Sequence, residues 1–407
     1  MIRKFRPVAN GVEIGMSIAQ HIILPGTESD LLRRELALGF AALGCRVSRL
    51  RPDEPGGLAS LAASPKTLLF SVNFQGLFPL RERLALLGAS AARAAVWLVD
   101  NPWNILSGVR DPRWKSLPIF VTDASFIKPL RAHGAEFVRH LPLAAAFELF
   151  APNEERDAAF APPKDAAPLC FVGRSAFPGK EAFFAGQQLP EGILAEAKAQ
   201  LEAGQRPNLT WWEDKLKLTG ALFWPGKKAR LAALGAENSN LAYRSLCLAA
   251  ACAAGACLAG AAAPALDIYG DDGWRALLPA GARLRSPVDY YARLPGIYAA
   301  YRYSLCLTSL QLPCGLNQRH FDIWAAGGFA LSDDTPGLDI FPGDLTRPIR
   351  FGKAPGLPAL PELVANLEKN NAKGDLQRQW RECLKNGHSY AHRAASVLEA
   401  LDAKNQH

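Results

Sequence analysis

The sequence predicts an α/β protein of two domains, each with a parallel sheet covered by helices. The chain has 407 residues, which is more than a single hydrophobic core usually serves. Short apolar or β-branched segments alternate with helical segments along most of it, as repeated βα units require. A proline-rich stretch at about 151–168 breaks this alternation and is typical of a linker between domains.

The composition is that of a folded protein with anionic partners. Hydrophobic residues make up 49% of the chain and charged residues 21%, unlike the composition of a disordered chain. The formal net charge of +8 favours nucleotide diphosphates, nucleic acid or an acidic membrane surface. No block rich in Lys and Arg stands out, so we expect no nucleic-acid partner. The cysteines form no CxxC pair, which indicates small buried residues in a reducing cytoplasm.

One uncharged run, Leu246–Leu266, is long enough to raise the question of a membrane span. Ala, Gly and Cys dominate the run, and these residues favour the bilayer far less than Leu or Ile does. We therefore expect a buried helix of a soluble domain and no transmembrane segment, while peripheral membrane contact stays open. The amino terminus is basic but lacks the apolar core of a signal peptide.

The first domain is expected over residues 1–155. Strand segments are predicted at 45–50, 68–73, 95–100, 119–123 and 137–141. Helical patterns such as 31–43 and 80–92 separate them. Three of the strand segments end in a polar residue, namely Asn73, Asp100 and Asp123. Because the carboxyl ends of parallel strands meet at one edge of a sheet, these side chains are expected to line one crevice.

The second domain is expected over residues 165–407. Its strand segments are predicted at 168–172, 265–269, 282–285, 303–308, 329–332 and 349–351. The region 180–263 is mostly helical and longer than a single crossover needs, so it is interpreted as a helical insertion. A polar helical pattern from 375 to about 402 closes the chain. Two Rossmann-type domains facing each other are the expected outcome.

The segment Thr308–Asp333 holds the most informative chemistry. It predicts a strand, a polar loop, a short helix and a second strand. Asn317, Gln318 and Arg319 precede or open the helix, whose amino terminus should offer free N–H groups and partial positive charge to a diphosphate. Asp322 lies one turn further on and could accept hydrogen bonds from two sugar hydroxyls. The alternative is a capped helix with one local salt bridge.

Two other loops follow predicted strands of the second domain. Gly173 lets the backbone approach a phosphate closely, and Arg174 beside it supplies a bidentate donor. Tyr269, Gly270 and Asp271 end the next strand, where Gly270 permits a tight turn and the aromatic ring could flank a base or a sugar. The alternative for each is an ordinary turn.

The amino-acid sequence of Thr308–Asp333 resembles the signature of the CgeB-like (spore-maturation) glycosyltransferases, a bacterial branch of the two-domain GT-B transferases. The passages 97–103, 267–274 and 388–393 carry the same resemblance. It implies a GT-B-like fold with an acceptor domain followed by a donor-nucleotide domain. It also implies transfer of a hexose-type sugar from a nucleoside-diphosphate sugar to a protein, polysaccharide or lipid acceptor.

The resemblance also implies roles for particular residues. The loop that holds the nucleotide base in GT-B relatives corresponds to Tyr290 and Leu294. The run from Asp322 to Gly327 matches the acidic element that holds the ribose hydroxyls in many of these enzymes. Cys314 stands where the common retaining pattern has a carboxylate eight residues before the ribose acid. The stereochemical course therefore stays open.

The expected reaction needs neither a metal nor another cofactor. Arg319, Arg174 and the helix terminus would stabilise the leaving diphosphate. An inverting reaction needs a base on the acceptor, expected from the first domain. Asp100 is the first choice, and its rivals are Asp123, His21 and Glu28.

Two histidines and two other functions remain to be considered. His388 and His392 have the spacing of metal ligands but no evident third ligand, so we expect them to serve packing. A non-catalytic sugar-nucleotide-binding or coat-assembly protein and a sugar-nucleotide 2-epimerase are the alternative functions.

Overall fold

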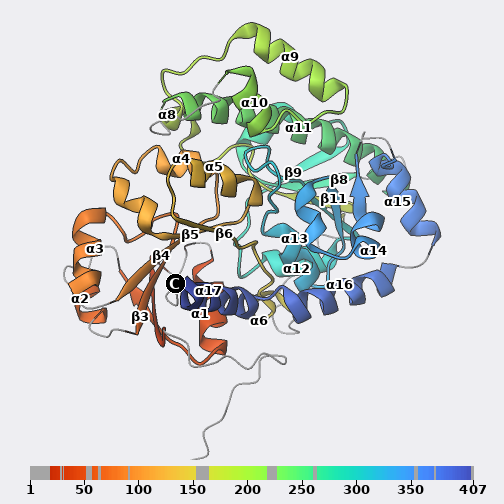
Figure 1. Cartoon of the computed structure of the whole chain (residues 1–407). Helices are drawn as coiled ribbons and strands as arrows, with labels where there is room; N and C mark the ends of the chain where they lie inside the picture. The colour runs from red at the N-terminus through yellow and green to blue at the C-terminus, as the bar shows by residue number, and fades with distance from the viewer. Residues whose placement is uncertain are drawn as a thin grey trace, which may run out of the picture. The chain divides into compact units, whose positions relative to one another are not determined.

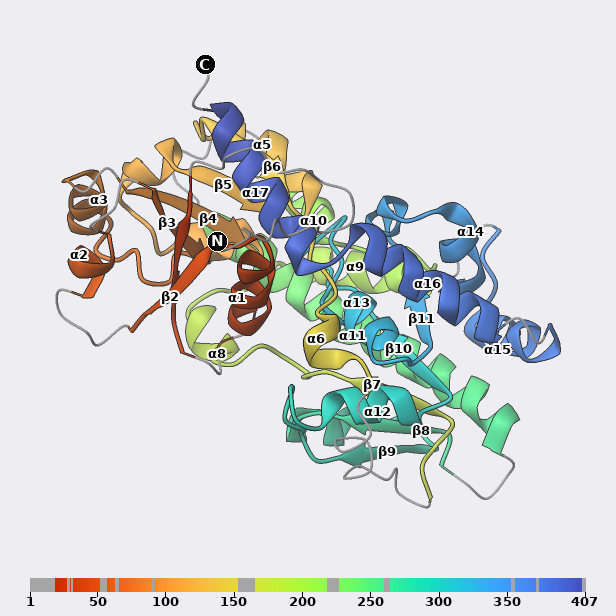
Figure 2. The ribbon, with the colours of Figure 1, turned by 90° about the horizontal axis from the view of Figure 1, so that it is seen from below.

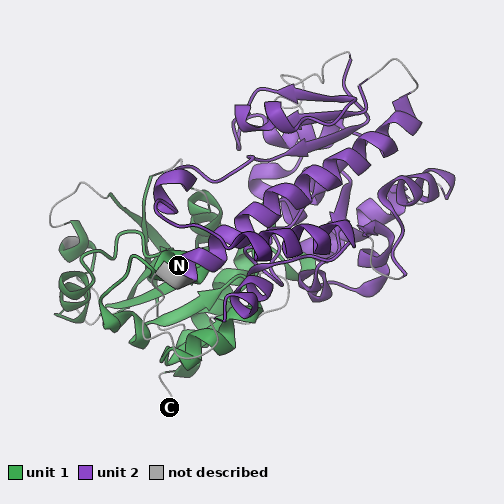
Figure 3. Cartoon of the chain, turned by 90° about the horizontal axis from the view of Figure 1, so that it is seen from above, with its two compact units in different colours: residues 1–146, 385–407 green, residues 147–384 purple. Residues whose placement is uncertain are grey.

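The computed structural model describes residues 19–27, 30, 32–51, 57–62, 66–89, 92–152, 165–217, 227–259, 264–352, 356–370 and 373–404. The chain forms two compact units, residues 1–146 with 385–407 and residues 147–384 (Figure 3). Each unit contains a six-stranded parallel sheet with helices around it (Figure 1). The two-domain α/β prediction is therefore confirmed. Most of the expected linker lies at 153–164, outside the described residues.

Unit 1 is built on a sheet with the order β2-β1-β3-β4-β5-β6. Its strands are β1 His21–Pro25, β2 Arg46–Leu50, β3 Thr67–Val72, β4 Arg93–Leu98, β5 Pro118–Val121 and β6 Phe137–His140. Its helices are α1 Arg33–Ala42, α2 Gly57–Leu61, α3 Leu80–Ala89, α4 Pro102–Leu106, η1 Pro112–Ser116, η2 Ala124–Phe126, α5 Ile127–Ala132 and α17 Tyr390–Lys404. Strand β1 was not predicted from the sequence, because only three apolar residues precede Pro25 and Gly26.

The last helix belongs to unit 1. Helix α17 packs against α1, where a Cβ on Gly39 would lie only 2.6 Å from the carbonyl oxygen of Tyr390. Arg393 is buried and its Nε donates to the carbonyl oxygen of Pro142 at 2.8 Å. These contacts place residues 385–407 with unit 1, whereas the sequence analysis extended the second domain to residue 407.

Unit 2 is built on a sheet with the order β12-β11-β10-β7-β8-β9. Its strands are β7 Leu169–Val172, β8 Leu266–Tyr269, β9 Ala282–Arg285, β10 Tyr303–Cys306, β11 Ala330–Asp333 and β12 Arg350–Phe351. Read from β9, this is the order 3-2-1-4-5-6 of dinucleotide-binding sheets. The order reverses between β7 and β10, which is where such sheets bind ligands at their carboxyl edge.

Helices surround the unit 2 sheet. They are α6 Phe147–Phe150, α8 Lys180–Phe183, α9 Glu191–Glu202, α10 Leu209–Lys215, α11 Lys227–Ala259, η3 Asp272–Leu277, α12 Leu294–Ala300, α13 Arg319–Ala325, η4 Pro336–Ile340, α14 Gly343–Thr346, η5 Arg347–Ile349, α15 Leu360–Lys369 and α16 Lys373–Gly387. The described residues from 180 to 259 are mostly helical, as predicted for the insertion, and α9 and α10 pack against α11.

Helix α11 joins this insertion to the sheet. It has 33 residues and so measures about 50 Å at ~1.5 Å per residue. Near its end, a Cβ on Gly255 would lie 2.1 Å from the carbonyl oxygen of Ala265, which precedes β8. Earlier in the helix, Asn240 accepts a hydrogen bond from the N–H of Leu310, in the loop after β10. Helix α11 therefore carries side chains to the carboxyl edge of the sheet.

The same helix has the composition of a membrane span. Residues Ala229–Ala259 are long and apolar enough to cross a bilayer, and 33% of their most apolar window is buried. A core helix of a soluble protein also meets this criterion, so one such helix is weak evidence. Burial is therefore partial, where the sequence predicted a buried helix.

Candidate functional site

Gly173 and Arg319 meet at the point where the strand order reverses. Gly173 follows β7, and Arg319 begins α13 after β10. A Cβ on Gly173 would lie 3.2 Å from Nη2 of Arg319 and 2.8 Å from Cζ of Phe171. The guanidinium therefore lies against the Gly173 backbone, because no side chain separates them.

Arg244 of α11 adds a second cation, which the sequence analysis missed. Burial lowers the pKa of Arg244 to about 10, and repulsion by the nearby Arg319 guanidinium adds to this effect. Its Nη1 donates to the carbonyl oxygen of Arg174 at 3.2 Å, and its buried Nε has no hydrogen-bond partner among the described residues. Among the described residues, neither Arg244 nor Arg319 forms an ion pair with a carboxylate. Glu237 and Asp333 partly offset the positive charge on Arg244, but two guanidinium groups still lie close together here, an arrangement that favours an anion.

The amino terminus of α13 differs from the prediction. The N–H groups of residues 319–322 donate to the side chain or carbonyl of Asn317 or to the carbonyl of Gln318. The Asn317 amide also donates to the carbonyl oxygen of Leu307 at 2.7 Å. Asn317, one residue before the N-cap Gln318, thus accepts the N–H of Arg319, and these N–H groups are not free for a phosphate.

Asp322 is fully buried, and both of its carboxylate oxygens accept hydrogen bonds. The hydroxyl of Tyr290 donates to Oδ2 at 2.5 Å, and Nε2 of Gln318 donates to Oδ1 at 2.8 Å. The structure thus brings together three residues that were predicted separately. Gln318 therefore supports the carboxylate of Asp322. This hydrogen bond directs its amide nitrogen to Asp322 and not to the anion site beside Arg244 and Arg319. A ligand hydroxyl would need Tyr290 to move before it could reach Oδ2.

The loops after β7 and β8 hold each other in place. A Cβ on Gly270 would lie 2.5 Å from the carbonyl oxygen of Gly173, so this close approach requires glycine. Asp271 accepts hydrogen bonds from the N–H of Ser175 at 3.1 Å and from its hydroxyl at 2.6 Å. Gly270 and Asp271 therefore shape the backbone on which Gly173 and the exposed Arg174 lie.

Two predicted contacts to a nucleotide base lie in the core instead. Tyr269 is buried in a cluster with Cys170 and Ile297, and its hydroxyl lies 2.9 Å from the hydroxyl of Tyr301. Leu294 is buried at the start of α12. Both side chains are committed to packing, so neither offers a surface to a base in this structure.

Asp100 lies at the carboxyl edge of the unit 1 sheet, as predicted. It is exposed after β4, and Nδ2 of Asn73 donates to its Oδ2 at 2.8 Å. Asn73 and Phe74 have φ angles of 50° and 64°, a strained left-handed conformation that turns the chain after β3. Desolvation raises the pKa of Asp100 although its side chain keeps exposed surface, and the hydrogen bond from Asn73 opposes the rise.

The rivals of Asp100 have other positions. Asp123 is buried and its carboxylate caps η2 by accepting the N–H of Ser125 at 2.8 Å. His21 is the first residue of β1, so it lies at the amino edge of the sheet, where Nε2 is 2.8 Å from the hydroxyl of Ser48. Glu28 lies outside the described residues. Of the described candidates, Asp100 alone is exposed at the carboxyl edge.

The two late histidines take part in packing around α17. Nδ1 of His392 lies 2.6 Å from the hydroxyl of Ser389, and Nδ1 of His388 accepts from Nη2 of Arg393 at 3.0 Å. Within the described chain, no group of three or more His, Cys, Asp or Glu side chains is placed to hold a metal ion.

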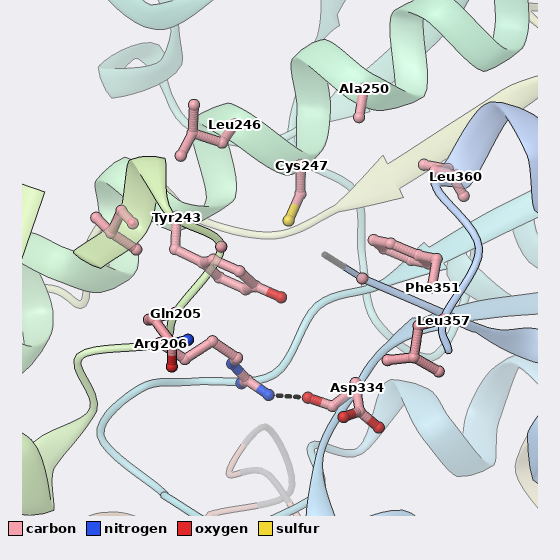
Figure 4. Close-up of a pocket in the computed structure, with 13 residues that line it drawn as sticks. Gln205, Arg206, Tyr243, Leu246, Cys247, Ala250, Asp334, Phe351, Leu357 and Leu360 are labelled. Carbon is pink, nitrogen blue, oxygen red and sulfur yellow. Dashed lines mark hydrogen bonds between the residues drawn. The ribbon is translucent and has the colours of Figure 1, made fainter. Parts of the chain in front are cut away.

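A separate pocket of about 140 Å³ lies between α11, α15 and β12 (Figure 4). It is mostly apolar, with Arg206 and Tyr243 among its polar lining residues. Arg206 donates to the carbonyl oxygen of Asp334 and pairs with Asp333 at 3.4 Å, so it joins the helical insertion to the end of β11. No predicted site residue lines this pocket.

Comparison with known proteins supports part of this picture. Residues 244–399, less than half of the chain, match a family model described as glycosyl transferase-like. The structure of Anabaena HepE in complex with UDP and glucose is similar at 10% identity and a TM-score of 0.50, covering 94% of this chain and 100% of that one. This similarity confirms the GT-B fold.

Two further structures show weaker similarity. Sucrose-phosphate synthase from Thermosynechococcus elongatus has 12% identity and a TM-score of 0.45, with 95% of this chain and 99% of that chain covered. A trehalose 6-phosphate synthase from Burkholderia multivorans has 8% identity and a TM-score of 0.48 over the same shares of the two chains. A search of curated proteins gave no match.

Proposed function

We propose that this protein is a cytoplasmic glycosyltransferase of the CgeB-like branch, which moves a hexose-type sugar from a nucleoside-diphosphate sugar to an acceptor. The observation that carries the proposal is the pair of guanidinium groups, Arg244 and Arg319, beside the Gly173 backbone where the strand order reverses. Both arginines lie in the segment that matches a glycosyl transferase-like model. An anion at the carboxyl edge of such a sheet is typically the phosphate of a nucleotide.

The diphosphate would lie between the two guanidinium groups and the backbone of Gly173. Negative charge grows on the diphosphate as its bond to the sugar breaks, and two fixed cations stabilise that charge in a partly desolvated site. A divalent metal is not needed for this step. Asp322 would accept a hydrogen bond from the ribose once Tyr290 has moved. HepE was solved with UDP and glucose, so UDP is the first nucleotide to test.

Asp100 would serve as the base if transfer inverts the anomeric carbon. The acceptor hydroxyl gives its proton to Asp100, its oxygen bonds to the anomeric carbon, and the old C–O bond leaves its electron pair on the diphosphate. A general base of this kind contributes a factor of roughly 10²–10⁴ to the rate. The hydrogen bond from Asn73 holds Oδ2, which leaves Oδ1 as the oxygen that could take the proton.

A panel of sugar nucleotides, incubated with the protein and an acceptor extract, tests the proposal. Release of nucleoside diphosphate that depends on the acceptor supports transfer. Binding without turnover favours a sugar-nucleotide-binding or coat-assembly protein, an alternative that the thiol of Cys314 in place of a carboxylate keeps open. Conversion of the donor without an acceptor favours a 2-epimerase. No binding of any sugar nucleotide would contradict all three.

A further inference from the structure

We propose that Tyr290 is a gate over Asp322. In this structure its hydroxyl bonds to the carboxylate oxygen that a ribose hydroxyl would use, and the loop that carries it must swing away before the donor nucleotide binds fully. The inference rests on the proposed function, because it takes Asp322 as the ribose acceptor. It assigns Tyr290 a role in which the wild-type side chain weakens binding of the donor nucleotide.

Asp322 is closed off from solvent by its neighbours. The residue has no exposed surface, and the phenol of Tyr290 donates to Oδ2 at 2.5 Å. A phenol and a sugar hydroxyl are the same kind of donor, with similar oxygen–oxygen distances to a carboxylate. The two therefore compete for one oxygen of Asp322.

Of the two hydrogen-bond donors to Asp322, Tyr290 can move away and Gln318 cannot. Gln318 lies one turn before Asp322 on the same segment and would move with it. Tyr290 lies between β9 and α12, is only half-buried, and contacts the ring edges of Phe150 at 5.2 Å and Tyr291 at 4.9 Å between centroids. The elements around it, α6, α12 and α13, lie together in Figure 2.

The loop that carries Tyr290 is held by hydrogen bonds of its own. Oδ1 of Asp289 accepts the N–H groups of Tyr291 and Ala292, and its carbonyl accepts those of Arg293 and Leu294. These hydrogen bonds stay within residues 289–294. The register between β8 and β9 ends at Arg285, so residues 289–294 take no part in that ladder.

The closed gate reduces the apparent affinity for the donor by the fraction of molecules in which it is open. Tyr290→Phe keeps the ring and removes the hydroxyl, which leaves the Oδ2 acceptor of Asp322 buried without this donor. Losing this hydrogen bond destabilises the form in which the Tyr290 loop is closed over Asp322. The form in which the loop is open therefore becomes more populated. We expect nucleotide affinity to rise about tenfold, the value of one hydrogen bond to a charged group.

Calorimetric titration with UDP and with GDP tests the gate in the full chain. Wild type, Tyr290→Phe and the matched control Tyr291→Phe are each titrated with the ribonucleotide and with its 2′,3′-dideoxy counterpart. The gate predicts tighter ribonucleotide binding by Tyr290→Phe only, with no gain for the dideoxy form, which has no hydroxyl to compete for Asp322. Equal gains for both forms would overturn the claim that Tyr290 stands in for a ribose hydroxyl.

The outcomes separate the gate from the function on which it rests. Ribonucleotide binding by wild type that Tyr290→Phe leaves unchanged or weakens overturns the gate alone, because Tyr290 is then neutral or a direct ligand contact. Failure of wild type and Tyr290→Phe to bind either UDP or GDP overturns the proposed donor site, and the gate with it. Thermal melting of each variant confirms that the comparison is made on folded protein.

Discussion

The Arg319 guanidinium rests against the backbone of Gly173, with Nη2 3.2 Å from the position that a Cβ would take there. Gly173 directly follows β7, and Arg319 begins the helix that comes after β10; the sheet order reverses between these two strands. Gly173 therefore provides space both for the guanidinium and for any phosphate that it holds.

Gly173→Ala should weaken UDP binding by about tenfold, because the new methyl group must displace either the Phe171 ring or the Arg319 guanidinium. Calorimetric titration measures the loss, and thermal melting shows whether the fold is retained. Gly192→Ala is the matched control, since a Cβ there meets nothing within 4 Å. Unchanged affinity in Gly173→Ala would show that the phosphate does not lie at this backbone.

Arg244→Ala and Arg319→Ala should each weaken UDP binding by roughly 10- to 100-fold, since each removes a hydrogen bond between charged groups. Lysine at either position should restore only part of the affinity, because it lacks the planar fork of arginine. Titration at two salt concentrations measures the effect, which should shrink at high salt. Arg275→Ala serves as the control, because Arg275 forms an exposed pair with Asp272. A result in which Arg244→Ala behaves like this control would remove Arg244 from the site.

Asp100→Asn should lower turnover by roughly 10²- to 10⁴-fold and leave UDP affinity unchanged, because the base acts on the acceptor. Asn73→Ala should lower turnover less and shift the pH profile of kcat, since Asn73 holds the carboxylate of Asp100. Nucleotide-release rates across pH measure both. Full turnover by Asp100→Asn would show that Asp100 is not the base.

His320 predicts a pH dependence of stability. Its ring is buried with Nε2 3.0 Å from the Ser332 hydroxyl, and burial lowers its pKa to about 4, below the unfolded value of 6.5. The native state therefore binds fewer protons than the unfolded state between these values. The neutral His320 ring therefore contributes to the free energy of unfolding fully above about pH 6.5. This contribution, of order 3 kcal/mol, is lost as pH falls towards 4.

Urea unfolding from pH 4 to pH 7 measures this effect. The difference in unfolding free energy between wild type and His320→Gln should grow with pH over this range and level off above pH 6.5. A difference that does not change with pH would show that the pKa of His320 is the same in the folded and the unfolded protein.

Much of the sheet could be predicted from sequence, because buried parallel strands appear as short apolar segments that end in polar or glycine residues. Gly173 and Asp100 were found in this way. Strand β1 was missed because its apolar part spans only Ile22–Leu24. The inward direction of Tyr269 was also missed, although side chains alternate along a strand and Tyr269 shares a face with the buried Asp267.

Which side chains meet in the site could not be predicted from the sequence, because they come from distant parts of the chain. Arg244 meets Arg319 only because α11 crosses the carboxyl edge of the sheet, and no local pattern encodes that meeting. One signal was present: Arg244 is the last charged residue before the uncharged run that ends at Leu266. The hydrogen bond from the Arg319 N–H to Asn317 could have been anticipated, since an Asn side chain often accepts the backbone N–H two residues on.

A crystal structure of the protein with UDP tests the central claim most directly. We expect the diphosphate between the guanidinium groups of Arg244 and Arg319, against the backbone of Gly173, with Tyr290 turned away from Asp322. A diphosphate bound elsewhere in unit 2, for example in the pocket of Figure 4, would contradict the account.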